Sequence, residues 1–210
     1  MIRRALEVRE KVLGREHPDT LTSVNNLGLV LHYQGKYEEA EAINRRALEE
    51  REKVLGREHP HTLTSVDNLG SVLRYQGKYE EAEQMNRRVL EEYEKVLGRE
   101  HPDTLMSVNN LALVLHYQGK YEEAEAMNRR ALEVREKALG REHPHTLTSI
   151  CNLAYLLHRQ ARFSEAGELY DRACSGYVKA LGSDHPTTRA CMACHYSLRE
   201  DMANQNVQTQ

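Results

Sequence analysis

The chain has 210 residues, with 29 Lys and Arg against 32 Asp and Glu and a formal net charge of −3. This balance lacks the basic excess of most nucleic-acid-binding proteins, and no apolar run approaches the roughly 18 residues that span a bilayer. The N-terminus lacks the apolar core of a secretory signal, and residues 1–150 contain no cysteine. We therefore expect a cytoplasmic protein with neither nucleic acid nor a membrane as its partner.

The five prolines reveal an internal repeat, because they recur every 42 residues and each follows a histidine. Residues 15–56 and 57–98 differ at only eight positions, and residues 99–140 and 141–182 align in the same frame. We predict a single domain over residues 1–204. It comprises a partial repeat (1–14), four full repeats (15–56, 57–98, 99–140, 141–182) and a degenerate capping helix (183–204), before a disordered tail at 205–210.

Each full repeat predicts two helices, as its first copy illustrates. Pro18 suits the first turn of a helix, and apolar residues then recur at three- and four-residue steps as far as the stop at Gln34-Gly35. A second helix begins at Tyr37 and ends at Gly56. Such a hairpin cannot bury both of its apolar faces alone, so the sequence predicts an all-α fold, an α-solenoid of stacked antiparallel hairpins.

Small residues recur at fixed offsets in each copy, as in Leu27-Gly28 followed by Ala40 and Ala47. This succession resembles the tetratricopeptide repeat, with a period of 42 in place of about 34 residues. The surrounding sequence is similar to the kinesin light chain and nephrocystin type of this repeat. Near-identical tandem copies also resemble the C-terminal arrays of fungal NOD-like receptors. The resemblance implies a non-catalytic module whose first helices line a concave groove that binds a peptide or partner protein.

The resemblance places one set of first-helix side chains in that groove. The set is Asn25, Asn26, His32, Tyr33, Asp67, Asn68, Arg74, Tyr75, Asn109, Asn110, His116, Tyr117, Asn152, Tyr155, His158 and Arg159. One asparagine per copy forms a ladder that, by the resemblance, contacts a peptide backbone, since an amide is both donor and acceptor. Alternatively, these amides only bond between neighbouring helices. Half of the differences between the first two copies fall on or near this side, which suits a recognition surface.

Other motifs are weaker candidates for a functional site. Cys191, Cys194 and His195 match a haem-attachment pattern, but they fall in the capping helix, and a second ligand pair for zinc is not obvious. Histidines of successive His-Pro pairs lie about 10 Å apart, too far to share an ion, and we interpret each as a helix-start residue. The serines that recur in frame from Ser23 are interpreted as surface positions. With no nucleophile–base set and no phosphate loop, we expect no metal, cofactor or catalysis.

Three roles remain open at this point. The chain could be the sensor part of a larger NOD-like-receptor-type protein, or a kinesin-light-chain-like cargo adaptor. It could also be a self-assembling scaffold, because residues 1–14 align with a second helix whose first helix is missing, as though cut from a longer array. That edge would expose Ala5, Leu6 and Val12 and could form homo-oligomers.

Overall fold

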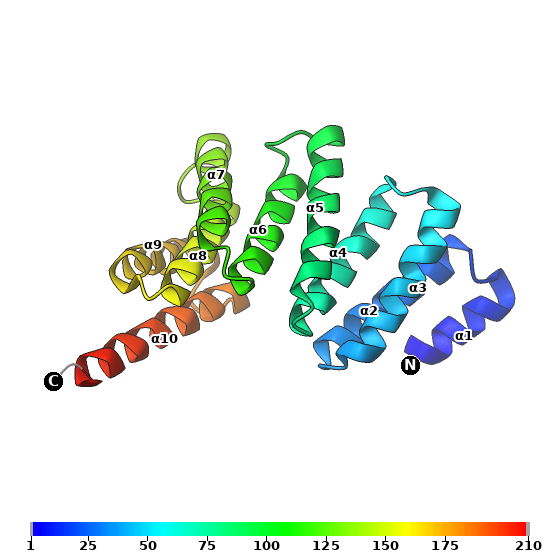
Figure 1. Cartoon of the computed structure of the whole chain (residues 1–210), viewed down its shortest axis with the longest axis horizontal. Helices are drawn as coiled ribbons and strands as arrows, with labels where there is room; N and C mark the ends of the chain where they lie inside the picture. The colour runs from blue at the N-terminus through cyan, green and yellow to red at the C-terminus, as the bar shows by residue number, and fades with distance from the viewer. Residues whose placement is uncertain (1, 209–210) are drawn as a thin grey trace. The chain divides into compact units, whose positions relative to one another are not determined.

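The computed structural model describes residues 2–208, and the secondary structure of this part consists of α-helices joined by short turns. The predicted all-α fold is confirmed. Ten helices follow one another along this part of the chain (Figure 1): α1 (Ile2–Leu13), α2 (Pro18–Tyr33), α3 (Tyr37–Leu55), α4 (Pro60–Tyr75), α5 (Tyr79–Val96), α6 (Pro102–Tyr117), α7 (Tyr121–Leu139), α8 (Pro144–Arg159), α9 (Phe163–Leu181) and α10 (Pro186–Gln208). No helix among them is both long and apolar enough to cross a membrane.

The helices pack into two compact units. The N-terminal unit covers Met1–Arg99 and holds α1 to α5, and the C-terminal unit covers Glu100–Gln210 and holds α6 to α10. Inside each unit consecutive helices pack as hairpins, and the first helices of successive repeats also touch, α2 with α4 and α6 with α8. Each of the four full repeats predicted from the sequence contains one pair of helices. That residues 1–204 form a single continuous domain stays a prediction.

Every first helix of a full repeat begins with the same capping contact. His17 has an extended backbone, and its Nδ1 accepts a hydrogen bond from the Asp19 backbone N–H at 3.2 Å. Pro18 follows at the first helical position, where a missing N–H costs nothing. The same contact recurs at His59, His101, His143 and His185. The prediction that these histidines start helices is confirmed, and the imidazole replaces the usual serine or aspartate cap.

The turn after the first helix of each full repeat contains a residue with positive φ. Gly35 has a φ of +72°, and Gly77 and Gly119 adopt the same conformation at the equivalent positions. In the last full repeat this position is occupied by Ala161, with a φ of 59°, the one non-glycine residue with positive φ in the part of the chain described. A Cβ in this left-handed region costs about 1 kcal/mol.

Small side chains and regularly spaced leucines build the core. Ala40 and Ala47 of α3 are fully buried, and they cluster with Val24 and Leu27 of α2. Leu6 joins this cluster and is only 6% exposed, so the prediction that it would be exposed is wrong. Its side chain packs with the apolar residues of α2, whereas Ala5 and Val12 are exposed as expected.

Buried arginines tie successive repeats together inside each unit. Arg51 of α3 donates to Ser65 Oγ at 2.8 Å and to the His61 carbonyl at 2.6 Å, both on α4. Arg135 of α7 makes the same pair of bonds to α8, with Ser149 Oγ at 2.6 Å. Burial lowers the pKa of both guanidinium groups.

The recurring serines therefore do not lie on the surface. Ser65 and Ser149 are completely buried, and Ser23 and Ser107 are nearly so. The prediction of surface positions is wrong because a hydroxyl on the buried face is tolerated when it finds a hydrogen-bond partner. Arg51 and Arg135 provide that partner in two of the repeats.

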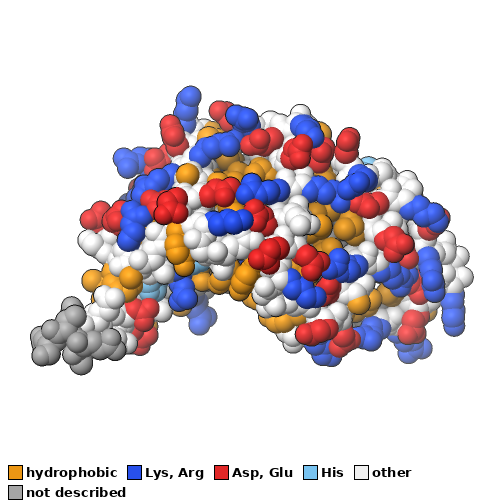
Figure 2. Space-filling model, viewed as in Figure 1, with side chains coloured by type: hydrophobic (Ala, Val, Ile, Leu, Met, Phe, Trp, Pro, Cys, Tyr) orange, Lys and Arg blue, Asp and Glu red, His pale blue; other side chains and the backbone are white. Residues whose placement is uncertain are grey.

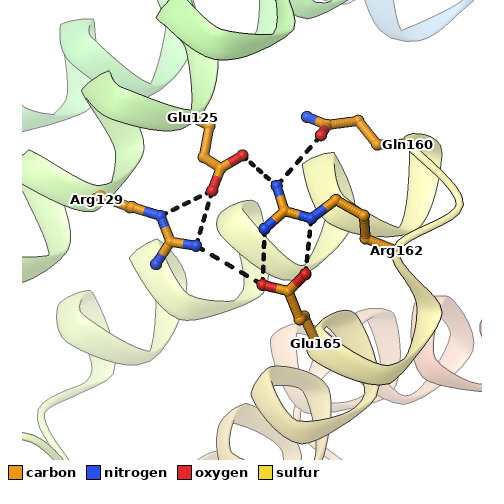
Figure 3. A network of polar contacts seen from close by, with 5 residues as sticks. All are labelled: Glu125, Arg129, Gln160, Arg162 and Glu165. Carbon is orange, nitrogen blue, oxygen red and sulfur yellow. Dashed lines mark hydrogen bonds and ion pairs between the residues drawn. The ribbon is translucent and has the colours of Figure 1, made fainter.

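Charged side chains join the second helices across each unit. In the C-terminal unit, Arg162 at the start of α9 contacts Glu125 of α7 (Figure 3). It also donates two hydrogen bonds of 2.7 Å to the carboxylate oxygens of Glu165. Arg129 of α7 completes the network by bonding Glu125 at 2.7 Å and lying 4.0 Å from Glu165. Hydrogen bonds from Arg162 lower the pKa of the Glu165 carboxyl.

The N-terminal unit repeats this network in the same frame. Lys78 bonds Glu41 at 2.7 Å, and Arg45 bridges Glu41 and Glu81. Burial raises the pKa of Glu41, but hydrogen bonds from Lys78, Arg45 and Gln76 outweigh it and bring the pKa to about 2. Figure 2 shows that both signs of charge are interspersed over the visible surface.

The last helix closes the C-terminal unit. Cys191 and Leu198 of α10 are buried against α9 and belong to the core of this unit. The helix runs to Gln208, so residues 205–208 are helical where the sequence predicts a disordered tail. No glycine or proline follows Pro186 to stop the helix. Residues 209 and 210 lie outside the described part.

Replacing Ala161 by glycine should stabilise the protein. The change removes a Cβ from the left-handed region, and it makes the unfolded chain only somewhat more flexible. We expect the free energy of unfolding to rise by about 0.5–1 kcal/mol, measured by urea denaturation followed by circular dichroism. The converse change Gly119→Ala should lower it by a similar amount, and equal midpoints for the two variants would contradict this reading.

Two glycines of α9 should respond in opposite ways to alanine. A Cβ on Gly176 would lie 2.5 and 2.8 Å from the methyl groups of the buried Leu147, whereas one on Gly167 would meet only Leu198 at an ordinary 3.6 Å. Gly176→Ala should therefore cost about 1–2 kcal/mol through overpacking. Gly167→Ala should add up to about 1 kcal/mol through helix propensity. Urea midpoints for both variants check the prediction, and a shift of the same sign in both would refute it.

Candidate functional site

The first helices form the surface on which the sequence places a binding site. We call it the first-helix face, meaning the surface of α2 and α4 in the N-terminal unit and of α6 and α8 in the C-terminal unit. The helices of each pair touch, so their side chains form one surface within each unit. The predicted residues are spread over this face in different degrees of burial.

An aromatic cluster lies at the C-terminal ends of α2 and α4. His32 packs edge-on against Tyr75 at 4.8 Å between ring centroids, and Tyr75 stacks on Tyr37 at 5.4 Å. The Arg74 guanidinium lies 4.2 Å above the Tyr75 ring. Tyr33 extends outward with 79% of its surface exposed, and Tyr75 is 50% exposed. The cluster therefore offers rigid aromatic surface together with a positive charge.

The surroundings of the histidine at the centre of this cluster disfavour its charged form. Burial lowers the pKa of His32, and the positive charge of Arg74 lowers it further. Its Nδ1 is buried without a hydrogen-bond partner. His32 thus serves as a packing platform for the three tyrosines around it.

A second cluster occupies the equivalent place in the C-terminal unit. His116 packs against Tyr117, Tyr121 and Tyr155 with ring centroids 5.2–6.2 Å apart. The hydroxyl groups of Tyr117 and Tyr155 are hydrogen-bonded at 3.0 Å. Burial, followed by this bond, raises the pKa of Tyr155 to about 12, and burial followed by the charge of Arg159 lowers the pKa of His116. His116 is only 5% exposed, deeper than a groove residue should be.

The asparagines differ from copy to copy. Asn26 is exposed, and Asn68, Asn110 and Asn152 are half-buried. Asn68 donates from Nδ2 to Oδ1 of Asn25 at 2.9 Å, so at this place the amides do bond between neighbouring helices. That contact engages one amide of the ladder within the protein. Backbone recognition by this set of asparagines stays a prediction.

The remaining predicted residues separate into open and covered positions. Asp67 and Arg74 are half-buried and Arg159 is exposed on the face, whereas Asn109 is 95% buried. His158 is 7% exposed, bonds Asp201 of α10 at 2.9 Å and packs against Phe163. The capping helix therefore covers His158, which sequence reasoning could not foresee because α10 departs from the repeat pattern.

The Cys191, Cys194 and His195 motif lies on α10 and takes part in packing. Cys191 Sγ lies 3.2 Å from Cys174 Sγ, and the His195 ring stacks on Tyr170 at 5.7 Å. Within the described residues, no group of three or more His, Cys, Asp or Glu side chains is arranged to hold a metal ion.

Two aromatic residues of the clusters were missed from the sequence. Tyr37 and Tyr121 begin second helices but turn their rings toward the histidines of the first helices. Their recurrence at 42-residue spacing, with Tyr79 between them and Phe163 as the fourth, was a signal that could have included them. The turn between the helices is short enough to bring both ends together.

Solved structures with the same architecture include two of one fungal protein. The nearly identical TPR-like repeats of a "putative kinesin light chain" from Podospora anserina match with a TM-score of 0.71 and 27% identity, over 86% of this chain and 85% of that chain. A single-substitution variant of those repeats matches with a TM-score of 0.74 and 27% identity, over 85% and 84%. BtubC (BKLC) from P. vanneervenii is 17% identical with a TM-score of 0.64, over 96% and 88%, which shows the fold alone.

Sequence comparisons point to the same family. No match is found among curated protein sequences. The family model described as tetratricopeptide repeat matches residues 1–49, 23–95, 65–137 and 103–179 in overlapping registers. These ranges extend over most of the chain and agree with the stacked hairpins described above. The chain therefore belongs to the tetratricopeptide repeat family.

Proposed function

We propose that the first-helix face of each unit binds an extended segment of a partner protein, without catalysis. The observation that carries the proposal is the exposure of tyrosines at fixed places: Tyr33 is 79%, Tyr75 50% and Tyr117 38% exposed. A tetratricopeptide module implies protein–protein interaction, and rigid tyrosines supply large contact area at low entropic cost.

The chemistry around these tyrosines suits a peptide ligand. In the N-terminal unit, Arg74 adds a positive charge over Tyr75, and Asn26 adds an exposed amide. The corresponding positions vary between the two copies, with His32 where the next copy has Arg74 and Leu29 where it has Ser71. Repeats that are otherwise nearly identical would in this way present different side chains to successive parts of a ligand.

For the larger context, we propose a cytoplasmic sensor array of the NOD-like receptor type. Its support is the near-identity of the tandem copies, with half of the differences between the first two copies on the first helix. A kinesin-light-chain-like cargo adaptor is the second candidate. The similarity to the Podospora anserina repeats, at 27% identity over most of both chains, favours it. An upstream nucleotide-binding domain in the full-length gene would select the receptor, and a heptad region the adaptor.

Removing single tyrosines should weaken peptide binding. Peptides selected from a phage-displayed library against the whole chain would be titrated by calorimetry into Tyr33→Ala and Tyr75→Ala. Each change should raise the Kd about tenfold or more, because a buried interfacial aromatic contributes over 1 kcal/mol.

The control for this test is Tyr196→Ala. Tyr196 is also an exposed tyrosine, at 64%, but it belongs to α10 and not to α2, α4, α6 or α8. Its removal should leave the Kd unchanged, and circular dichroism should show full helicity in all three variants. Equal affinity of the Tyr33 and Tyr75 variants and the parent protein would rule out the proposed surface.

A further inference from the structure

A recess opens beside α9 in the C-terminal unit. It has a volume of about 350 Å³, at the small end of the range for ligand-binding pockets, and it lies between the loop after α7 and one side of α9. Its lining includes three basic residues, Arg141, Arg172 and Lys179, and the small residues Ser175 and Gly176. We call it the basic recess. None of these five residues belongs to α2, α4, α6 or α8.

The charge around the basic recess is opposite to that of the equivalent places in the N-terminal unit. The same three basic residues recur there in the repeat frame, but each set is accompanied by four acidic residues, which are Glu10, Glu16, Glu49 and Glu50 in one place and Glu52, Glu58, Glu91 and Glu92 in the other. Around the basic recess this frame contains two, Glu136 and Glu142, because Ser175 and Gly176 replace the consecutive glutamates. The net charge of the set therefore changes from −1 to +1.

The N-terminal unit shows what the missing glutamates bind. Glu50 accepts a hydrogen bond from Arg46 Nε at 3.0 Å. In the next repeat, the carboxylates of Glu91 and Glu92 lie 2.9 and 3.0 Å from the Lys95 ammonium. Hydrogen bonds between two ionised groups are roughly twice as strong as neutral ones. In those copies the chain thus supplies its own carboxylates to its basic residues.

The basic residues of the recess retain donors for a further anion. Arg172 stands in the frame of Arg46, and its Nη2 donates to Glu136 at 2.5 Å and to a backbone carbonyl at 3.4 Å. Its Nε makes no hydrogen bond to any residue that the structure describes. Lys179 lies 3.3 Å from Glu142, but their side chains are 65% and 75% exposed, so this surface pair adds little energy.

Two small residues keep the recess open. Ser175 is exposed and contributes only a short side chain, whose hydroxyl is a further donor. Gly176 has no side chain, and the methyl groups of Leu147 lie 2.5 and 2.8 Å from the place of a Cβ. This turn of α9 therefore has no carboxylate of its own to offer Arg172 and Lys179.

We propose that the basic recess binds an acidic segment of a partner protein, with two consecutive Asp or Glu residues. The ligand has the chemistry of the missing pair, with one carboxylate on Arg172 Nε and the other on the Lys179 ammonium. Both groups are donors only, and a carboxylate is an acceptor only. The recess is separate from the exposed tyrosines of the first-helix face, so this second site does not depend on the function proposed above.

The test is an NMR titration of the ¹⁵N-labelled whole chain at low ionic strength, because salt screens exposed charges. The probe is the blocked peptide acetyl-Ala-Glu-Glu-Ala-amide, and the controls replace Glu-Glu by Gln-Gln or by phosphoserine-Ala. We expect the Glu-Glu probe to shift the backbone amides of Ser175 and Gly176 and the Nε–H signal of Arg172. It should bind at least about tenfold more tightly than the Gln-Gln peptide.

Matched variants assign the binding to this recess. Arg172→Gln and Lys179→Gln should each weaken probe binding about fivefold or more, because each removes a charged donor. Lys95→Gln is the control, since Lys95 has the same place in a repeat that retains both glutamates, and it should leave the affinity unchanged. Ser175→Glu supplies Lys179 with the partner that Glu91 gives Lys95, so it should also weaken binding. Circular dichroism should show full helicity in all four variants.

Four results would overturn the proposal. They are equal binding of the Glu-Glu and Gln-Gln peptides, unchanged affinity in both Arg172→Gln and Lys179→Gln, and shifts at Glu91 and Glu92 as large as those at Ser175 and Gly176. The fourth is tighter binding of the phosphoserine peptide, which would identify a phosphate ligand.

The two proposed surfaces can fail separately. Tyr33→Ala should leave binding of the Glu-Glu probe unchanged. Tyrosine-dependent binding of the selected peptides without a probe response defeats the basic recess and leaves the first-helix face standing. A probe response that depends on Lys179, with no effect of the tyrosine variants on the selected peptides, does the opposite.

Discussion

A helical hairpin cannot bury two apolar faces by itself, and this constraint governs the whole structure. Each repeat leaves a stripe of leucine and valine that only a neighbouring repeat can cover. Close approach then requires small residues, which is why Ala40 and Ala47 are fully buried at the contact. Polar contacts also join neighbouring repeats, since Arg51 of one repeat donates a hydrogen bond to Ser65 of the next. Stability is thus a property of neighbours and not of single hairpins.

The two helices of a repeat have different roles. The second helices carry networks of alternating charge, in which Glu41 and Glu125 each accept from two basic residues. Such pairs add little energy singly at a surface, but they fix the lateral register of neighbouring helices. The first helices can then vary at their outward positions without disturbing the stack. Recognition and cohesion therefore depend on different sets of residues.

Much of the fold could be predicted from the sequence because its signals are local. Helix period, the prolines and the glycine stops lie within one copy, and 42-residue recurrence repeats the same signals along the chain. The errors concern contacts between copies. Ser65 is read as a surface residue because its partner Arg51 belongs to another repeat, and Leu6 is buried by α2.

The candidate site could be predicted only in outline. The sequence identifies the helices that carry it, but burial within that face depends on side chains of several copies. The sequence gives no sign that His158 is covered by α10 or that Asn25 pairs with Asn68. The same holds for Asn109, which is identical to Asn25 in type and frame and differs only in what surrounds it.

Within each unit, helices contact only helices of the same or the next repeat, and this has a genetic consequence. A repeat of 42 residues corresponds to a whole number of codons, and its junctions fall in short loops that end at the same His-Pro cap. Unequal recombination between such similar copies would add or delete an entire layer in frame, with both new neighbours already complementary. Such a lineage could change the length of its binding surface in one event, before any point substitution refined it.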